Sequence, residues 1–414
     1  MRSTFKGQVF ALLVIPIAII GCSQEQHQRV ELPNLIIMLA DDLGYNDLTC
    51  CRDTGLQTGI SPTCETPFID SLARMGIRFT NFYCGAAVCS PSRSALLTGR
   101  NKTRLGIYNW IPASSPMHLR NEETTIAELL KQKNYATAHF GKWHLSSANM
   151  EQPEPLDQGF DYAFWTHNNA EPSHENPVNF IDNRVKAGEL KGYSSHLVVE
   201  KATKWLDERE NMRQPFYINI WFHEPHSKEA APDSLKNRIR AGTTSAITGH
   251  FTDLLPTIAA ITDCKMPGNK KIDGENITDV LLGRTEELQR SDPVFFYRYF
   301  HDPICMLRQG DMVLLGYQRK PKPRHMNYNE REEALFKPHE GEPPWSQWSF
   351  QKSHMDALVL QSPRYFELYD IKDDPGQYND LSDEEIELTE HMKNIMMALR
   401  NEMVEEGGNW FPDD

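Results

Sequence analysis

The segment CGAAVCSPSRSALLTGR places Cys89 at the start of a stretch that is typical of an α-helix. Ser90 favours the N-cap, Pro91 suits the first helical position, and Gly99 favours the end of the helix. A helix N-terminus attracts anions, because its first N–H groups and the helix dipole point outward there. Arg93, one turn along, offers a planar fork of donors for an oxyanion or a carboxylate. We therefore expect Cys89 to lie where an anionic group can bind.

Three further groups of polar residues each follow a short apolar run, and the pairs are Asp41 with Asp42, Lys142 with His144, and His223 with His226. Carboxylate oxygens suit hard cations such as Ca²⁺ and Mg²⁺. Histidine suits proton transfer, because its pKa lies near neutrality. Since ligands of open parallel sheets bind at the carboxyl ends of the strands, we expect these pairs to converge. The segment THNN at 166–169 is a weaker candidate for contact with a substrate.

The elements that must position these groups alternate along the chain. Continuous apolar runs such as NLIIMLA and PFYINIWF predict buried parallel strands, and segments such as TTIAELLKQK between them have helical spacing. This alternation predicts an α/β domain with a mainly parallel sheet flanked by helices over residues 31–290. From about Ser291 short strands follow one another, which predicts a smaller C-terminal α+β subdomain over 291–414.

Composition limits the class of protein. The 414 residues carry 43 basic and 57 acidic side chains, for a net charge of −14. A nucleic-acid binder needs clustered Lys and Arg to neutralise phosphates, so we expect no nucleic-acid partner. A chain of this length can enclose a deep site without disulfides. Because pairing cannot be deduced from sequence, a local bond between Cys84 and Cys89 stays open as an alternative.

The N-terminal residues predict export. A basic start and a short apolar run over residues 1–21 are typical of a signal peptide rather than a membrane span. The boundary IIGC resembles a bacterial lipobox, which implies a lipid on Cys22, a tether over 22–30, and a place in the periplasm or at the cell surface. A plain signal peptide with a chance cysteine is the alternative.

The motif CSPSR followed by LTGR is similar to the maturation motif of the type I sulfatases, in the alkaline phosphatase-like superfamily. The segments NLIIMLADDLGYNDL, YATAHFGKWHLS and PFYINIWFHEPH resemble the family in the family's order. The resemblance implies an arylsulfatase-like hydrolase that cleaves sulfate esters of a carbohydrate or an aryl alcohol. It also implies a maturation enzyme that converts Cys89 to formylglycine, the nucleophile of the family.

The resemblance assigns roles to the residues at the strand ends. Asp41, Asp42 and the converted Cys89 would bind a divalent cation, calcium in most of the family, with magnesium as the alternative. Sulfate and the nucleophile would be contacted by a further four residues, Arg93, Lys142, His144 and His226. Of the two histidines near the end of the third segment, His223 is the weaker candidate.

One part of the family pattern is missing from the sequence. After HEPHS the family continues through a helix, a buried strand with an Asp-Asn-Gly turn, and a second substrate lysine, whereas this chain is shortened near 227–241. Its only Asp-Asn pair, Asp182-Asn183, lies earlier and outside an expected strand. Two alternatives therefore stay open: a catalytically impaired or truncated homologue that at most binds sulfated glycans, and a phosphoester or phosphonate hydrolase of the same superfamily.

Overall fold

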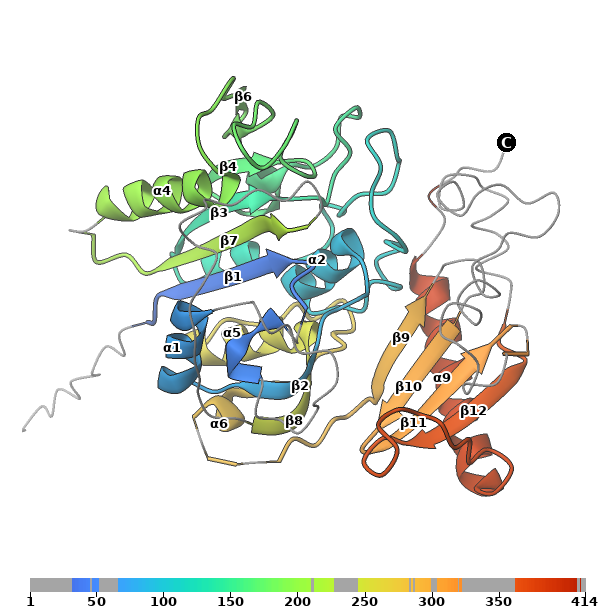
Figure 1. Cartoon of the computed structure of the whole chain (residues 1–414). Helices are drawn as coiled ribbons and strands as arrows, with labels where there is room; N and C mark the ends of the chain where they lie inside the picture. The colour runs from blue at the N-terminus through green and yellow to red at the C-terminus, as the bar shows by residue number, and fades with distance from the viewer. Residues whose placement is uncertain are drawn as a thin grey trace, which may run out of the picture. The chain divides into compact units, whose positions relative to one another are not determined.

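The structure is a computed structural model that describes residues 32–44, 47–51, 66–209, 212–226, 245–282, 284–285, 287–298, 304–318, 320–321, 362–407 and 410. Residues Pro33–Asp414 form one compact unit (Figure 1). The predicted signal peptide, Cys22 with its tether, and the shortened segment near 227–241 lie outside the described residues, so those predictions stay predictions. In the described ranges no helix has the length and apolar character to span a bilayer.

The main sheet is α/β in character, as predicted. Its strands lie in the order β1-β7-β3-β4-β5-β6, and neighbours among the first four are parallel. The bounds are β1 Leu35–Asp41, β7 Phe216–Pro225, β3 Ala136–Lys142, β4 Tyr162–Thr166, β5 Ile181–Asp182 and β6 Val185–Lys186. The last two strands are antiparallel and form a small hairpin at the edge. The Asp-Asn pair therefore begins in a strand, contrary to expectation, and Asp182 binds Lys201 there.

Helices lie around the main sheet (Figure 1). The α-helices of this part are α1 Pro67–Met75, α2 Cys89–Thr98, α3 Ile126–Lys131, α4 Ser194–Asp207, α5 Leu254–Thr262 and α6 Thr278–Leu281. Short 3₁₀ turns occur at Thr49–Cys51, Pro155–Gln158 and Phe251–Asp253. Helix α4 packs against β3 and β7 through Val198, Ala202 and Trp205 (Figure 1).

The central strands β3 and β7 are largely buried. All seven residues of β3 are buried, including the polar side chains of Thr137, His139 and Lys142. Gly141 has φ of +103°, and a Cβ added there would collide with the carbonyl of Trp221 on β7. Only glycine therefore fits at this position of β3. The indole of Trp221 also stacks on that of Trp143, just past β3.

Strand β1 forms one end of the main sheet, and in the described part of the chain it pairs with β7 alone. Ile36 and Met38 on β1 are 50% and 54% exposed. A separate parallel pair joins β2 Phe79–Tyr83 to β8 Ser245–His250. An edge strand with exposed apolar side chains invites pairing with other chains. Strand β1, which the sequence predicts to be buried, is thus partly exposed to solvent.

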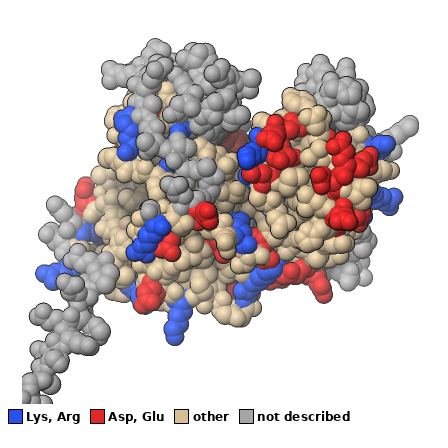
Figure 2. Space-filling model, turned by 90° about the horizontal axis from the view of Figure 1, so that it is seen from below, with Lys and Arg blue, Asp and Glu red and all other residues tan. Residues whose placement is uncertain are grey.

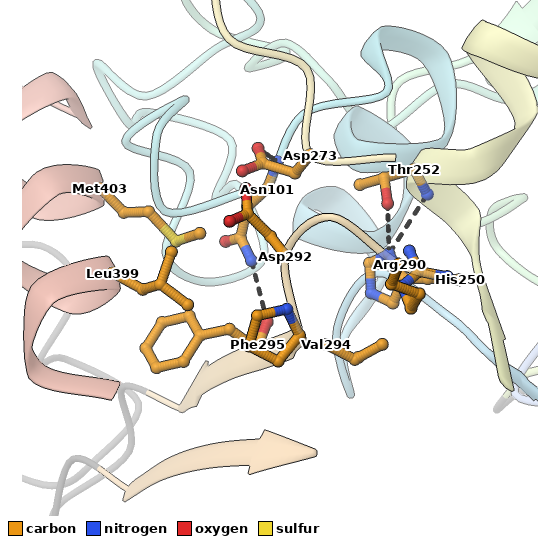
Figure 3. Close-up of a pocket in the computed structure, with 11 residues that line it drawn as sticks. Asn101, His250, Thr252, Asp273, Arg290, Asp292, Val294, Phe295, Leu399 and Met403 are labelled. Atoms are coloured by element: carbon orange, nitrogen blue, oxygen red, sulfur yellow. Dashed lines mark hydrogen bonds between the residues drawn. The ribbon is translucent and has the colours of Figure 1, made fainter. Parts of the chain in front are cut away.

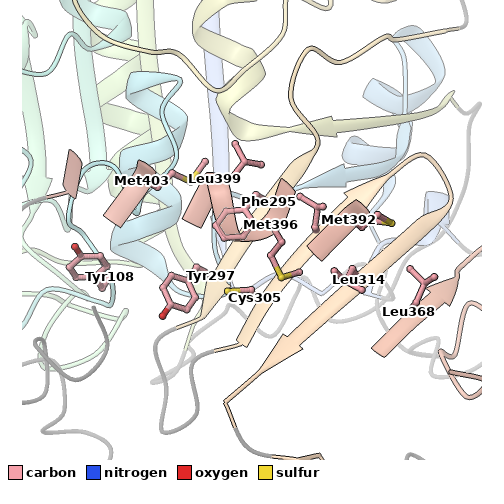
Figure 4. Packing of buried hydrophobic residues seen from close by; sticks show 11 residues of the cluster. Tyr108, Phe295, Tyr297, Cys305, Leu314, Leu368, Met392, Met396, Leu399 and Met403 are labelled. Carbon is pink, nitrogen blue, oxygen red and sulfur yellow. The ribbon is translucent and has the colours of Figure 1, made fainter. Parts of the chain in front are cut away.

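The C-terminal part contains a four-stranded antiparallel sheet in the order β12-β11-β10-β9. The bounds are β9 Val294–Arg298, β10 Ile304–Gln309, β11 Met312–Tyr317, β12 Tyr365–Asp370 and, for the helix that covers the sheet, α9 Ile386–Gly407. Methionines of α9 pack on apolar side chains of the strands, as Figure 4 shows. The short strands expected after Ser291 are present, with a long helix against them.

Buried polar contacts connect this sheet and helix to the α/β part. Arg104 pairs with Asp273 and reaches Glu402 of α9 at 2.9 Å. The Asn101 side chain donates to the carbonyl of Phe295 on β9 at 2.9 Å, beside a small cavity (Figure 3). That cavity holds about 20 Å³, which is room for about one water molecule and too little for an organic ligand. These contacts therefore stabilise the fold and do not form a ligand site.

On the face shown in Figure 2, acidic side chains gather on one side of the molecule and basic ones are scattered singly. This distribution gives no basic stripe on that face for a nucleic-acid backbone to follow. It agrees with the negative net charge of the sequence.

Candidate active site

Asp41, the last residue of β1, lies buried between two cations. Its Oδ2 accepts a hydrogen bond from Lys142 Nζ at 2.6 Å, and its Oδ1 lies 3.2 Å from Arg93 Nη2. Burial by itself would raise the pKa of Asp41, but Arg93 and Lys142 outweigh burial and lower that pKa to about 2. Asp41 is therefore anionic at neutral pH, with its charge balanced inside the protein.

Lys142 and His144 come from the end of β3 and are both buried. Burial lowers the pKa of Lys142, against the opposing influence of Cys89 and Asp41. His144 has φ of +53°, which turns the chain sharply after the strand. Its Nε2 lies 3.0 Å from the carbonyl of Ile111, and its Nδ1 has no hydrogen-bond partner. Burial, with the charges of Lys142 and Arg93, holds the pKa of His144 well below its usual range.

A carbonyl oxygen only accepts hydrogen bonds, so the bond to Ile111 assigns the proton of neutral His144 to Nε2. The Nδ1 atom then carries a lone pair. An imidazole held in this state can accept a proton but has none to give from that side. His144 is thus arranged as a base.

Helix α2 begins at Cys89, as predicted, but its N-cap is Val88 and not Ser90. Ser90 lies inside the first turn, where its hydroxyl accepts from the backbone N–H of Ile111 instead. The N-cap rule failed here because a tertiary partner took the serine oxygen. Gly99 ends the helix with φ of +65°, as expected. Arg93 donates from Nη1 to the carbonyl of Lys142 at 2.6 Å.

Cys89 is partly exposed at the wall of a cavity of about 260 Å³, whose other polar lining residues are Asp41, Asp42, Cys84, Ser92 and Arg93. Cys84 and Cys89 are both free thiols, so the alternative of a local disulfide is wrong. The Cys84 thiol donates instead to the carbonyl of Ala86 at 2.9 Å. The structure therefore brings the α2 N-terminus, two carboxylates and one arginine to a single cavity.

His226 directly follows β7 and lies beside Asp42, whereas His223 lies in the core. The His226 Nε2 atom lies 3.5 Å from Oδ2 of Asp42, a carboxylate that is 63% exposed. His223 is fully buried and its Nε2 contacts the Thr166 hydroxyl at 2.8 Å. Burial, with the charge of Lys142, holds the pKa of His223 well below its usual range. The two histidines of the HEPH segment thus have different surroundings, one facing the group and one inside the core.

Asn169, which the sequence indicated only weakly, contacts two of the predicted site residues. Its Oδ1 accepts from Lys142 Nζ at 2.8 Å, and its Nδ2 lies 3.2 Å from His226 Nδ1. The signal for it is position: β4 is parallel to β3, with Lys142 opposite Thr166, so the THNN segment leaves the sheet beside the lysine. An isolated asparagine after a strand gives no stronger signal.

A second cavity, of about 510 Å³, is lined in part by His144 and Asn169. Its other polar lining residues are Ser146, Asn149, His167, Asn168, Glu171, Asn179 and Lys186. Amide groups both donate and accept hydrogen bonds, which matches the hydroxyl groups of a polyol. The volume is in the range of sites for small organic ligands.

The residues at the end of β1 do not by themselves fit a complete divalent-cation site. Calcium takes about six to eight oxygen ligands. Within the described residues no group of three or more His, Cys, Asp or Glu side chains is arranged to hold a metal. Asp41 already pairs with Lys142 and Arg93, which leaves Asp42 as the accessible carboxylate. No chemical step is therefore assigned to a metal in this site.

Comparison with known proteins identifies the family. The sulfatase family model matches residues 33–248, which is more than half of the chain and includes every strand-end residue described above. The chain belongs to the sulfatase family. Sulfatases generally use a divalent metal and a formylglycine.

Curated sulfatases match this chain over part of their length. Arylsulfatase G of Rattus norvegicus is 39% identical over 158 residues, covering 38% of this chain and 28% of the relative. Arylsulfatase A of Homo sapiens is 43% identical over 129 residues, covering 31% and 24%. The uncharacterized sulfatase YdeN of Escherichia coli K12 is 31% identical over 256 residues, covering 52% and 45%. The matched regions thus span less than half of each relative.

Solved structures share the fold over most of the chain. Ps i-CgsB in complex with k-i-k-neocarrahexaose superposes with a TM-score of 0.65 at 18% identity, covering 89% of this chain and 93% of that one. BT4656 in complex with its substrate D-glucosamine-2-N,6-O-disulfate gives 0.61 at 16% identity, covering 91% and 98%. These likenesses support the mainly parallel α/β architecture of the sulfatase.

Proposed function

We propose that the protein is a sulfuric ester hydrolase in which residue 89, converted to formylglycine, is the nucleophile. The observation that carries the proposal is the placement of Cys89 at the α2 N-terminus, in one cavity with Asp41, Asp42 and Arg93. A helix N-terminus and an arginine both stabilise negative charge that develops on a sulfuryl group. A formylglycine hydrate would supply one hydroxyl to attack sulfur and a second whose loss of a proton expels sulfate.

The surrounding side chains divide the remaining work. Lys142 and Arg93 place positive charge beside the reacting position, where low dielectric strengthens their effect. His144 holds an unprotonated Nδ1 and is suited to take a proton. His226, at the opening toward Asp42, is suited to donate a hydrogen bond to the leaving alcohol oxygen. Two histidines in different hydrogen-bonding environments thus support two different roles.

The proposed substrate is a sulfated carbohydrate. The cavity beside His144 and Asn169 is lined by several amides and is large enough for a sugar ring. Two proteins of the same fold, Ps i-CgsB and BT4656, were solved with a neocarrahexaose and with a glucosamine disulfate. An aryl sulfate would instead leave these amides without partners for their hydrogen bonds.

Further proposals concern partners and metal. A formylglycine-generating enzyme would act on the CSPSR motif, and a lipid on Cys22 would anchor the exported protein in the periplasm or at the cell surface. Asp41 and Asp42 are the proposed ligands of a divalent cation, calcium before magnesium, together with residue 89. The described residues alone do not complete that site.

The test couples mass spectrometry to sulfate release. The full chain is coexpressed with a formylglycine-generating enzyme, and the peptide that contains residue 89 is analysed for the mass of formylglycine in place of cysteine. Release of sulfate is then measured on glucosamine 6-sulfate, with and without added calcium. Cys89→Ala should abolish release, whereas Cys84→Ala, in the same cavity but outside α2, should retain it.

Three outcomes would count against the proposal. Unmodified cysteine at 89 in a chain that still releases sulfate would refute the nucleophile assignment, and so would turnover that survives Cys89→Ala. Modified protein without turnover would favour the impaired homologue. Faster hydrolysis of glucosamine 6-phosphate than of the 6-sulfate would favour the phosphoester hydrolase.

A further inference from the structure

Asn169 joins two of the proposed catalytic side chains through one amide group. It lies three residues past the end of β4. Its Oδ1 accepts from Lys142 Nζ at 2.8 Å, and its Nδ2 lies 3.2 Å from His226 Nδ1. No other residue in the described part of the chain is recorded in a side-chain hydrogen bond with both Lys142 and His226.

The orientation of this amide follows from the chemistry of its partners. A lysine ammonium group can only donate hydrogen bonds, so the amide oxygen must face Lys142. The amide nitrogen then faces His226 and can only donate to it. The Nδ1 atom of His226 must accept, which assigns the proton of the neutral imidazole to Nε2. That Nε2 atom faces the exposed carboxylate of Asp42.

The position of Asn169 is itself fixed by its neighbours. Its backbone carbonyl accepts from Asn179 Nδ2 at 2.8 Å. The hydroxyl of Thr166 donates to the carbonyl of Asn168 at 2.5 Å, which tightens the chain directly after β4. A side chain held in this way can orient its partners instead of following them.

We propose that Asn169 is a positioning residue that holds neutral His226 in its Nε2–H form and fixes the ammonium group of Lys142. His226 then presents a donor N–H at the opening of the site, opposite in kind to the lone pair that His144 presents. The catalytic consequence rests on the proposed function, whereas the proton position on His226 does not. The experiment therefore separates the two.

Nuclear magnetic resonance of protein labelled with ¹⁵N-histidine reads the proton position directly. Spectra are recorded on the full chain at pH 8, above the ordinary imidazole pKa of about 6.5. The His226 signals are assigned by their loss in His226→Gln. Wild-type protein should show the Nε2–H pattern at His226.

The deciding variant is Asn169→Asp. A carboxylate still accepts from Lys142, but it also accepts from His226 Nδ1 and should move the proton to that nitrogen. The matched control is Asn168→Asp, which adds the same charge one residue away. Among the described contacts, the hydrogen bond to His226 comes from Asn169 and not from Asn168. The control should keep the wild-type pattern. An Nδ1–H pattern in wild type, or an unchanged pattern in Asn169→Asp with the fold retained, would overturn the inference.

Kinetics provide the second measurement on the matured enzyme. Asn169→Asp should lower kcat about a hundredfold on glucosamine 6-sulfate, because the Nε2–H hydrogen bond that stabilises the charge developing on a poor leaving alcohol oxygen is lost, with KM changed less than about threefold. The loss should be less than about tenfold on 4-nitrophenyl sulfate, whose leaving group is stable as an anion and needs little such stabilisation. Equal losses on the two esters would contradict the donor role. If wild type shows no turnover at all, the proposed function fails, but the spectra still decide the assignment of Asn169.

Discussion

The charge balance around Asp41 gives a prediction that can be worked out from the structure. The pKa of Asp41 is lowered from 3.8 to about 2 by Arg93 and Lys142, against the effect of burial. Each pKa unit corresponds to about 1.4 kcal/mol, so the charged form contributes about 2 kcal/mol to folding at neutral pH. Asp41→Asn also leaves two buried cations without their anion, which raises the expected loss to about 3 kcal/mol.

The pH dependence has a definite sign. A carboxyl group with a lowered pKa contributes its full stability above about pH 4, where it is charged in both states, and loses it as the pH falls toward 2. The cost of Asp41→Asn should therefore be about 3 kcal/mol at pH 7 and should shrink below about 1 kcal/mol near pH 2.

Urea unfolding followed by tryptophan fluorescence measures this cost, with EDTA present so that no bound cation contributes. Asp42→Asn is the matched control, because that carboxylate is 63% exposed and its removal should cost less than about 0.5 kcal/mol. A cost for Asp41→Asn that stays below about 1 kcal/mol at pH 7, or that does not change between pH 7 and pH 2, would refute the reasoning.

Two further predictions concern the sheet. Gly141→Ala should cost more than about 3 kcal/mol in urea unfolding or prevent folding, because its Cβ meets the Trp221 carbonyl, while Gly188→Ala, at positive φ in open space, should cost about 1 kcal/mol. Equal losses of unfolding free energy in the two variants would show that the positive φ, and not the collision with the Trp221 carbonyl, sets the cost. The double variant Ile36→Thr with Met38→Thr should lower self-association of the protein, measured by light scattering. It should change the free energy of unfolding by less than about 1 kcal/mol, because both side chains are half exposed. Unchanged self-association would show that the exposed edge of β1 does not mediate it.

The fold was predictable from the sequence where the apolar runs are long. The strands β1 and β7 match the runs NLIIMLA and PFYINIWF, although β1 alternates between partly buried and exposed residues over its first half. The start of α2 at Cys89 followed from composition, but its cap did not, since Ser90 bonds to Ile111 from a distant part of the chain. The hairpin at Asp182 was missed because two-residue strands carry no periodic signal.

The candidate site was predictable as a set of residues but not as a network. The sequence indicated Asp41, Lys142, His144 and His226, and the structure brings all four to the carboxyl ends of neighbouring strands. Their partners were not predictable, because a hydrogen bond between the ends of two strands depends on register and on side-chain direction. Asn169 is the main residue that sequence reasoning undervalued.

The sequence by itself determined which chemical groups stand at the ends of which strands, because local apolar patterning places them there whatever the rest of the chain does. Only the tertiary structure decided that Asp41 is neutralised by Lys142 and Arg93 and that Asn169 lies between Lys142 and His226. These contacts join segments that lie far apart in the chain. They exist because parallel strands in a fixed register bring their carboxyl ends within hydrogen-bonding distance.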